Sequence, residues 1–201
     1  NRIAGVCFTG STQTAQGIHQ LMATNLAPEA LLIAETGGLN AGIIDSTALP
    51  EQAVRDTVAS AFQSAGQRCS ALRILYVQED IAEDLLEVLF GAMDELSLSD
   101  PRYLSTDLGP VISNSAKQKI DEYISAAKAE GKLLKQLQAP EGGSFVGPAV
   151  IEVDGIGSLG EEIFGPVLHV VRFHSDDFER IIDDINDSGY GLTFGLHTRI
   201  S

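Results

Sequence analysis

The clearest candidate for chemistry in this 201-residue chain is a cysteine in a glycine-containing break between an expected helix and an expected strand. Cys69 follows Gly66 and has small or polar neighbours, so its sulfur should be reachable from solvent. Arg68 beside it would favour the thiolate, which is the nucleophilic form of a thiol. The alternative is a buried, inert cysteine, the commonest state of a free cysteine. Cys7, within an apolar strand, is expected to be buried in that way.

A carboxylate at the end of another expected strand is a candidate general base. Glu35 follows the apolar segment 30–34 and precedes Thr36 and two glycines. In parallel α/β sheets, ligands bind beyond the carboxyl ends of the strands. A carboxylate that is partly withdrawn from water can take up a proton near neutral pH. Taken alone, a glutamate that ends a strand and faces water is the commoner explanation.

Two further segments contain groups suited to a dinucleotide. Residues 8–12 read Phe-Thr-Gly-Ser-Thr and lead from a strand into a helix, so Gly10 and Ser11 would lie at the positive end of the helix dipole, where a pyrophosphate binds well. Residues 160–167 place Glu162 and Phe164 in a turn before an apolar strand, where the carboxylate could bind ribose hydroxyls and the ring could pack on a flat ligand. A plain helix cap and a loop with a packing phenylalanine are the simpler alternatives.

The elements that would position these residues alternate along the chain. Pro50 is expected to open a helix, with Ser46 or Thr47 as its cap. A loop-rich stretch with short strands is expected over 139–160. The alternation predicts an α/β fold with a mostly parallel sheet and flanking helices. The expected strands are 3–8, 30–34, 41–44, 72–77, 167–173 and 192–197, and the expected helices are 14–24, 50–64, 80–96, 115–130 and 178–186.

Composition excludes several classes of protein. The chain has 13 basic and 28 acidic residues and a net charge of -15, which disfavours nucleic acid as a partner. No apolar run is long enough for a membrane span, and no secretory signal is recognisable. Two cysteines do not make a disulfide framework, and free cysteines favour the cytoplasm. Four scattered histidines argue against a metal site.

The four candidate segments together resemble the aldehyde dehydrogenase superfamily in their order and spacing. Residues 8–12 match its cofactor turn, and 35–38 match its Glu-Leu-Gly-Gly box, with Thr36 in place of Leu. Residues 66–69 match its Gly-Gln-x-Cys box, and 161–166 match its Glu-Glu-Ile-Phe-Gly-Pro box. Further stretches resemble the L-glutamate γ-semialdehyde (1-pyrroline-5-carboxylate) dehydrogenase module of the bifunctional proline-utilisation proteins, including Leu39 where the superfamily usually has Lys. These stretches are 34–41, 45–52, 60–73 and 189–193.

The resemblance implies NAD-dependent oxidation of L-glutamate γ-semialdehyde to L-glutamate, the second step of proline catabolism. The Cys69 thiolate would attack the aldehyde carbon, hydride would pass to the nicotinamide, and Glu35 would activate the water that releases the product. The Cys69 N–H would form half of an oxyanion hole, and the segment that normally supplies the other half is not in the chain. Ser11 would contact the pyrophosphate of NAD and Glu162 its nicotinamide ribose. The expected cofactor-binding residues are Gly10, Ser11, Glu162 and Phe164.

The resemblance also implies a division of the chain. Residues 1–36 would be the C-terminal end of a Rossmann-type NAD-binding domain, and 37–201 an incomplete catalytic domain. The chain starts with Asn1 instead of Met, which favours an origin within a longer protein. The fragment alone is expected to be inactive, and the intact protein is expected to be a cytoplasmic homo-oligomer that acts on a small aldehyde. FAD would belong only to a proline dehydrogenase domain outside this chain.

Three alternatives remain open at this point. One is a non-catalytic aldehyde-dehydrogenase-like module that serves oligomerisation, against which the presence of both Cys69 and Glu35 argues. Another is an aldehyde dehydrogenase for a different substrate, which the four boxes permit and the narrower stretches disfavour. A third is a plain nucleotide-binding module, which would leave the cysteine box unexplained.

Overall fold

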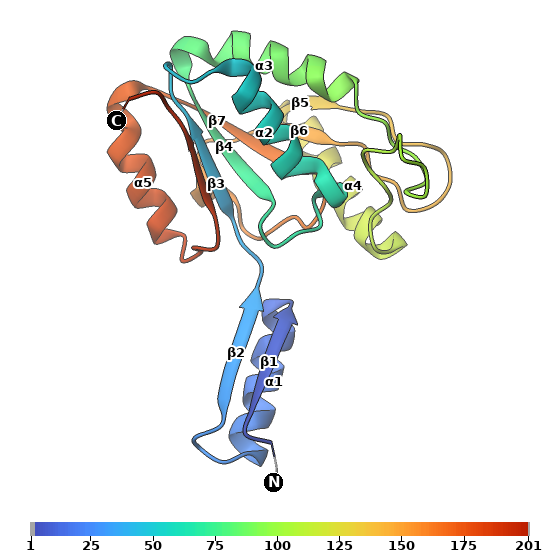
Figure 1. The fold of residues 1–201 in the computed structure, drawn as a ribbon, viewed down its shortest axis with the longest axis vertical. Helices are drawn as coiled ribbons and strands as arrows, with labels where there is room; N and C mark the ends of the chain where they lie inside the picture. The colour runs from blue at the N-terminus through green and yellow to red at the C-terminus, as the bar shows by residue number, and fades with distance from the viewer. Residues whose placement is uncertain (1–2, 201) are drawn as a thin grey trace. The chain divides into compact units, whose positions relative to one another are not determined.

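Residues 3–200 are described by a computed structural model, in which the backbone divides into two units (Figure 1). The first unit is Asn1–Gly37 and the second is Gly38–Ser201. Each unit is described by itself below. The outermost residues of the two expected domains, 1–2 and 201, lie outside the described residues. The assignment of the units to cofactor binding and catalysis stays a prediction.

The first unit is a strand, a helix and a strand. The two strands pair in parallel, with Gly5 opposite Leu31 and Gly10 opposite Thr36. Ser11 is the N-cap of the connecting helix, and its hydroxyl accepts a hydrogen bond from the Thr14 N–H at 3.2 Å. Ser11 therefore caps this helix, and its assignment to a pyrophosphate stays a prediction. The elements are β1 (Gly5–Gly10), α1 (Thr12–Asn25) and β2 (Leu31–Thr36).

The expectation that Cys7 is buried is wrong for this chain. Cys7 lies in β1 as expected, but its side chain is exposed. Among the described residues, β1 pairs only with β2, and one helix covers this two-stranded sheet. Ala15 and Met22 are the only buried side chains of that helix. A strand of apolar sequence is thus left with much of its surface open to solvent.

The second unit is built on a six-stranded sheet in the order β5-β6-β7-β4-β3-β8. Every neighbouring pair is parallel except β5 and β6, which confirms a mostly parallel sheet. The edge strand β5 was not expected from the sequence. The strands are β3 (Asn40–Ile44), β4 (Leu72–Gln78), β5 (Leu133–Gln136), β6 (Ala149–Glu152), β7 (Val167–Phe173) and β8 (Phe194–His197).

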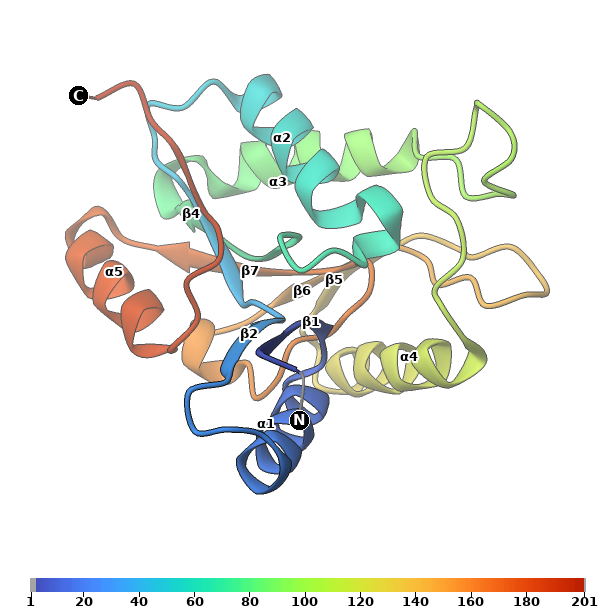
Figure 2. The ribbon, with the colours of Figure 1, turned by 60° about the horizontal axis from the view of Figure 1, so that its bottom comes forward.

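Helices cover both faces of this sheet, as Figure 2 shows. Leu75 and Val77 of β4 pack in the cluster that includes α2 and α3, while Ile74 and Tyr76 pack in the cluster that includes α5. Burial on both faces explains why residues 74–77 of β4 form a continuous apolar run. The helices are α2 (Pro50–Phe62), α3 (Glu79–Asp94), α4 (Asn114–Ala129) and α5 (Phe178–Asp187).

Helix α2 begins at Pro50, as expected, but its cap and its end differ from the expectation. Its N-cap is Leu49, without a side-chain hydrogen bond, so neither Ser46 nor Thr47 is the cap. The Thr47 hydroxyl instead donates to the Asp45 carboxylate at 2.6 Å. Pro50 at the first helical position has no N–H to satisfy, which reduces the need for a capping side chain. The α-helix ends at Phe62 and is followed by the short turn η1 (Gln63–Gly66), in which Ser64 and Ala65 have non-helical backbone angles.

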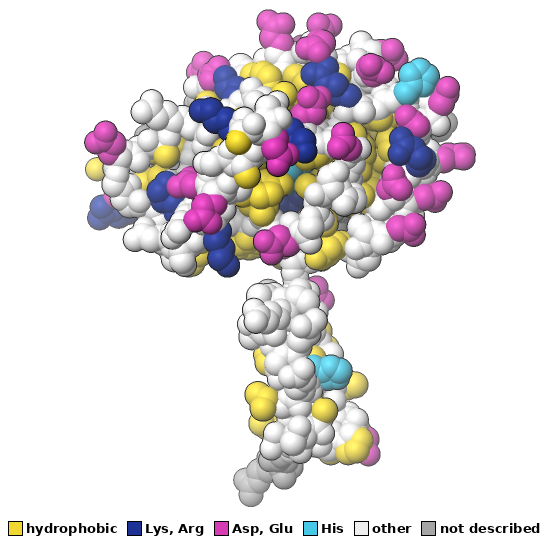
Figure 3. Space-filling model, turned by 180° about the vertical axis from the view of Figure 1, so that it is seen from behind, with side chains coloured by type: hydrophobic (Ala, Val, Ile, Leu, Met, Phe, Trp, Pro, Cys, Tyr) yellow, Lys and Arg dark blue, Asp and Glu magenta, His cyan; other side chains and the backbone are white. Residues whose placement is uncertain are grey.

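The surface of the second unit carries scattered charges. Figure 3 shows acidic side chains distributed over the visible face with lysine and arginine between them. The full chain has a net charge of -15. No described helix has the length and apolar character needed to cross a membrane.

Candidate active site

The loop that carries Cys69 begins with an unusual backbone turn. Ser64, Ala65 and Gly66 have φ angles of 56°, 53° and 65°, in the left-handed region that side-chain-bearing residues seldom adopt. A Cβ atom on Gly66 would lie 2.1 Å from the Gly165 carbonyl oxygen. Only glycine therefore allows this loop to cross the 161–166 segment so closely. This close approach brings together the two predicted motifs of the second unit, residues 66–69 and 161–166.

Side chains of the loop anchor it further. The Ile112 N–H donates to the Gln67 side-chain oxygen at 2.7 Å, and the Gln67 amide donates to the Ser64 carbonyl at 3.1 Å. Arg68, which was expected to favour the Cys69 thiolate, donates to the Ser64 hydroxyl at 3.0 Å. Its guanidinium is therefore engaged within the loop. Cys69 itself is exposed, as expected for a reactive thiol.

A buried asparagine holds the backbone on the far side of Cys69. Asn40 has 3% of its surface exposed, and its Nδ2 donates to the carbonyls of Cys69 and Ala71 at 2.7 and 2.8 Å. Its Oδ1 accepts the Thr193 N–H at 3.1 Å. A Cβ atom on Gly38 would lie 3.2 Å from the Cys69 carbonyl, so this glycine gives the chain room beside it. Sequence reasoning did not assign Asn40 a role.

A second residue that sequence reasoning missed is the buried Arg73. Its side chain is 1% exposed and forms an ion pair with Glu162, which is 14% exposed. Nη2 and Nε donate to the same carboxylate oxygen at 2.8 and 3.1 Å. The other carboxylate oxygen accepts the Gly38 N–H at 3.2 Å. Glu162, expected to bind ribose, is therefore fixed in place by two neighbouring segments.

Burial and neighbouring charge act in opposite directions on the pKa of this arginine. Burial lowers the pKa of the Arg73 guanidinium from its usual value, while the charge and hydrogen bonds of Glu162 and the charge of nearby Cys69 raise it. Arginine remains protonated in proteins, so the group is a permanent buried cation. Phe164 is 44% exposed, with its ring centroid 5.3 Å from the guanidinium carbon of Arg73, which is a cation–π contact.

His169 on β7 supports the backbone of Arg73. It is 2% exposed, and its Nδ1 lies 2.8 Å from the Arg73 carbonyl oxygen. A carbonyl only accepts, so Nδ1 carries the hydrogen and Nε2 accepts from the Tyr123 hydroxyl at 2.8 Å. Burial is the main cause that lowers the pKa of His169 to about 4. The imidazole is therefore neutral at physiological pH.

The remaining predicted site residues lie at one edge of the first unit. Glu35 in β2 is opposite Thr9 in β1, and Gly10 is opposite Thr36, so the carboxyl ends of the two parallel strands hold Glu35, Gly10 and Ser11 near one another. Glu35, Gly10 and Ser11 are all exposed. The partial burial expected for a base at Glu35 is therefore not supplied by this unit.

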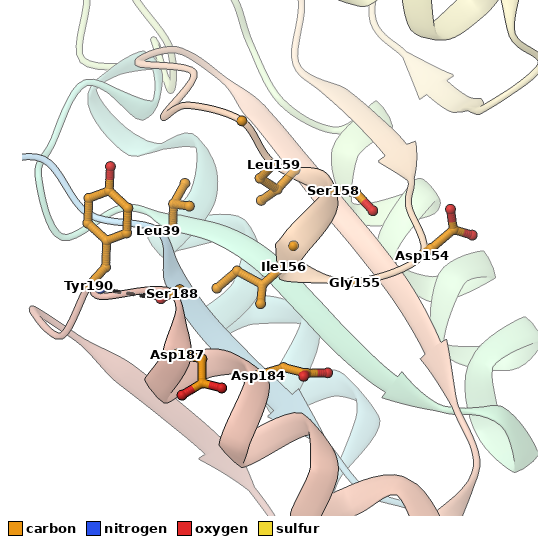
Figure 4. Close-up of a pocket in the computed structure, with 12 residues that line it drawn as sticks. Leu39, Asp154, Gly155, Ile156, Ser158, Leu159, Asp184, Asp187, Ser188 and Tyr190 are labelled. Carbon is orange, nitrogen blue, oxygen red and sulfur yellow. Dashed lines mark hydrogen bonds between the residues drawn. The ribbon is translucent and has the colours of Figure 1, made fainter.

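A pocket of about 500 Å³ in the second unit was not expected from the sequence (Figure 4). It lies between the 154–160 loop and the end of α5, and Leu39 forms part of its wall. Asp154, Asp184 and Asp187 line it, so it would repel the pyrophosphate of a dinucleotide. None of the predicted site residues is among the described residues that line it. Within residues 3–200, no group of three or more His, Cys, Asp or Glu is arranged to hold a metal ion.

The sequence profile of the aldehyde dehydrogenase family matches residues 1–200, so the chain belongs to this family. The bifunctional protein PutA of Klebsiella aerogenes is 48% identical over 210 aligned positions, which cover 99% of this chain and 16% of that protein. A crystal structure of a bifunctional proline utilization A (PutA) protein has a TM-score of 0.94 and 52% identity, over 98% of this chain and 20% of that one.

A Thermus 1-pyrroline-5-carboxylate dehydrogenase, solved with bound NAD, has a TM-score of 0.88 and 35% identity. The match covers 99% of this chain and 39% of that one. The chain thus spans about a sixth of the length of the PutA relative from Klebsiella aerogenes, 16%. The resemblance in the four boxes is confirmed at the level of the family, and so is the α/β fold.

Proposed function

We propose that the intact protein containing this chain is an NAD-dependent aldehyde dehydrogenase that oxidises L-glutamate γ-semialdehyde to L-glutamate. The observation that carries the proposal is Cys69, an exposed thiol in a loop whose backbone is held from two sides by Asn40 and Arg73. Membership of the aldehyde dehydrogenase family supports the reaction class. Similarity to PutA and to 1-pyrroline-5-carboxylate dehydrogenases supports the substrate.

In the proposed reaction, the Cys69 thiolate forms a bond to the aldehyde carbon and gives a thiohemiacetal. Bound NAD would supply the oxidising power by accepting the hydride from that carbon. The product on the enzyme is a thioester of Cys69. Glu35 then takes a proton from water as the water oxygen attacks the thioester, and L-glutamate and the Cys69 thiolate are released. Two protons and two electrons are removed from the hydrated aldehyde overall.

The residues fit a dinucleotide in their chemistry. Gly10 and Ser11 precede the 14-residue helix α1, whose first N–H groups favour an anion such as pyrophosphate. The Glu162 carboxylate can accept hydrogen bonds from ribose hydroxyls, and the half-exposed Phe164 offers an apolar ring beside it. We assign these four residues to NAD on that basis, with Ser11 at the pyrophosphate and Glu162 at the nicotinamide ribose.

Further features of the intact protein belong to the same proposal. We assign it to the cytoplasm and expect a homo-oligomer. FAD would be bound only by a proline dehydrogenase domain outside this chain, as the similarity to bifunctional PutA proteins suggests. Residues 1–36 would complete the NAD-binding domain, and 37–201 would form part of the catalytic domain.

A panel of aldehydes tests the substrate assignment. NADH formation by the intact protein is measured with L-glutamate γ-semialdehyde, with aldehydes that lack its α-amine or α-carboxylate, and with a simple aliphatic aldehyde. The highest kcat/KM is expected for L-glutamate γ-semialdehyde. A higher kcat/KM for another aldehyde would contradict the substrate, and no NADH with any aldehyde would contradict the reaction class.

A further inference from the structure

The peptide that joins Arg68 to Cys69 is held by its carbonyl oxygen. The Arg68 carbonyl accepts hydrogen bonds from Arg73 Nη2 and from the Ala71 N–H, both at 3.1 Å. A trans peptide is planar, so the N–H of Cys69 points away from that oxygen. Within residues 38–200, the Cys69 N–H has no protein acceptor. A fixed, free donor thus stands next to an exposed thiol.

The same guanidinium holds the segment expected to contact the cofactor. Arg73 Nε and Nη2 donate to Glu162, and Nη1 donates to the Gly165 carbonyl at 3.1 Å. One buried cation therefore contacts three acceptors on two chain segments. One segment carries the proposed nucleophile and the other carries the carboxylate proposed to bind ribose.

We infer that Arg73 is a positioning residue for both the nucleophile and the cofactor-binding carboxylate of the proposed reaction. Through the Arg68 carbonyl, Arg73 fixes and polarises the peptide bond between Arg68 and Cys69. The N–H of that peptide would stabilise the oxygen that becomes negative when Cys69 attacks an acyl carbon. Through the ion pair, Arg73 fixes Glu162 for the ribose of NAD. Arg73 acts through these two groups and contacts neither substrate nor cofactor. The inference rests on the proposed function.

The geometry requires arginine at this position. A guanidinium presents five N–H donors in a planar fork, whereas a lysine ammonium is a compact point charge. The acceptors of Arg73 lie on different sides of the fork, so lysine can keep the ion pair with Glu162 but not the full set of bonds. Lysine should therefore retain part of the cofactor effect and lose much of the peptide effect.

Two measurements on the intact protein, a rate and an affinity, test this inference. Transfer of the acetyl group from p-nitrophenyl acetate to Cys69, with release of p-nitrophenolate, needs the thiol and its oxyanion donor but no NAD. Affinity for NAD, measured by calorimetry, reports on Glu162. The variants are Arg73→Gln and Arg73→Lys, and the matched control is Arg172→Lys. Arg172 on neighbouring β7 also pairs with carboxylates, those of Glu83 and Glu152.

Acetylation rates are expressed per titrated Cys69, so that loss of folded protein does not count as loss of rate. Arg73→Gln is expected to lower this rate by roughly tenfold or more, which is less than the roughly 10²–10³-fold lost when an oxyanion donor is removed outright, because the Cys69 N–H remains present. It should also weaken NAD binding by roughly tenfold, a change of about 1.4 kcal/mol. Arg73→Lys should fall between Arg73→Gln and wild type, and Arg172→Lys should match wild type in both measurements.

The opposite outcomes overturn the inference. If the Arg73 variants have fewer titratable thiols but unchanged rates and affinity per site, the residue is only structural. If only the acetylation rate or only the NAD affinity falls, Arg73 does not position the group on which the unchanged measurement reports. If neither variant folds, a crystal structure of the intact wild-type protein with NAD decides the question, because separation of Arg73 from either the Arg68 carbonyl or Glu162 would refute the proposal. An acetylation rate per mole of folded protein that is unaffected by Cys69→Ser would instead show that the proposed function itself is wrong.

Discussion

At the scale of single residues, the two cysteines of the chain differ in how their backbone is held. Both are exposed, so exposure alone does not distinguish them. Cys7 lies in β1 with ordinary strand pairing to β2. Cys69 lies in a turn where Arg73 and Asn40 bind the carbonyls on its two sides. Such fixed geometry is what a nucleophile next to an oxyanion donor requires.

Replacement of each cysteine by serine separates their roles. In the intact protein, Cys69→Ser should lower kcat for aldehyde oxidation by several orders of magnitude, as loss of a catalytic nucleophile does. Cys7→Ser should leave kcat unchanged. NADH formation at saturating aldehyde is the measurement. A Cys69→Ser protein with normal turnover would exclude the thioester route.

His169 predicts a specific dependence of stability on pH. Its folded-state pKa is about 4, below the usual value of 6.5, because burial disfavours the charged imidazole. The unfolded chain therefore binds the extra proton first, so the stabilisation is complete above pH 6.5 and is lost as the pH falls toward 4. The loss amounts to roughly 3 kcal/mol over this window.

A glutamine variant isolates this effect from the carboxylates that also titrate in acid. His169→Gln should be less stable than wild type near neutral pH, because hydrogen bonds to the Arg73 carbonyl and the Tyr123 hydroxyl are disturbed. The difference in free energy of unfolding should shrink as the solution is acidified. Urea unfolding of both proteins across this pH range is the measurement, and parallel stability curves would contradict the account.

At the scale of elements, the connection from α2 to β4 sets the position of Cys69. Gly66→Ala would place a methyl group 2.1 Å from the Gly165 carbonyl, at a φ of 65° that alanine disfavours. The variant should lose about 1–3 kcal/mol of stability and should acetylate more slowly per folded site. Thermal unfolding and the p-nitrophenyl acetate rate measure these two effects.

Gly91→Ala is the matched control, because Gly91 lies within α3 and a Cβ there would meet no atom within 4 Å. Alanine in a helix interior should stabilise the protein by roughly 0.5–1 kcal/mol and leave acetylation unchanged. If Gly66→Ala behaves like Gly91→Ala, the close crossing of the two loops has no role in positioning the thiol.

Elements with strong local patterns were predictable from the sequence. The strand expected over 167–173 is β7 (Val167–Phe173), and the helix expected over 80–96 is α3 (Glu79–Asp94). In α3 the buried residues recur at helical spacing, and in β7 five of the seven residues are both apolar and buried. The edge strand β5, with the sequence Leu-Leu-Lys-Gln, is too short and too polar to give either signal.

The parts of the candidate site that were missed depend on contacts between distant positions. Asn40 and Cys69 are 29 residues apart, and Arg73 and Glu162 are 89 apart, so no local pattern reports their pairing. The sequence nevertheless contained one indication of Arg73 as a site residue. An arginine inside an otherwise apolar strand must find a partner when it is buried, and this could have identified Arg73. The burial of Cys7 was wrongly expected because apolar sequence was equated with a covered strand.

At the scale of the whole molecule, the chain should bind NAD poorly by itself. It covers 39% of the Thermus relative that was solved with NAD. An anion at one exposed helix N-terminus gains only about 0.3–1 kcal/mol, whereas micromolar binding needs about 8 kcal/mol. Calorimetry of the 201-residue chain with NAD should therefore show no micromolar binding. A clean micromolar Kd would show that these residues already provide most of the cofactor site.

Cys69 is proposed to form the thioester, and Glu35 to promote its hydrolysis. Mass spectrometry of the intact Glu35→Gln protein, quenched in acid after mixing with NAD and glutarate semialdehyde, examines both roles in one experiment. This aldehyde has the chain length of L-glutamate γ-semialdehyde but no amine that could attack the thioester. We expect an acyl group on the peptide containing Cys69, which accumulates in Glu35→Gln, turns over in wild type and is absent in Cys69→Ser. Formation of NADH with no acyl group on Cys69, or with acylation of another residue, would contradict it.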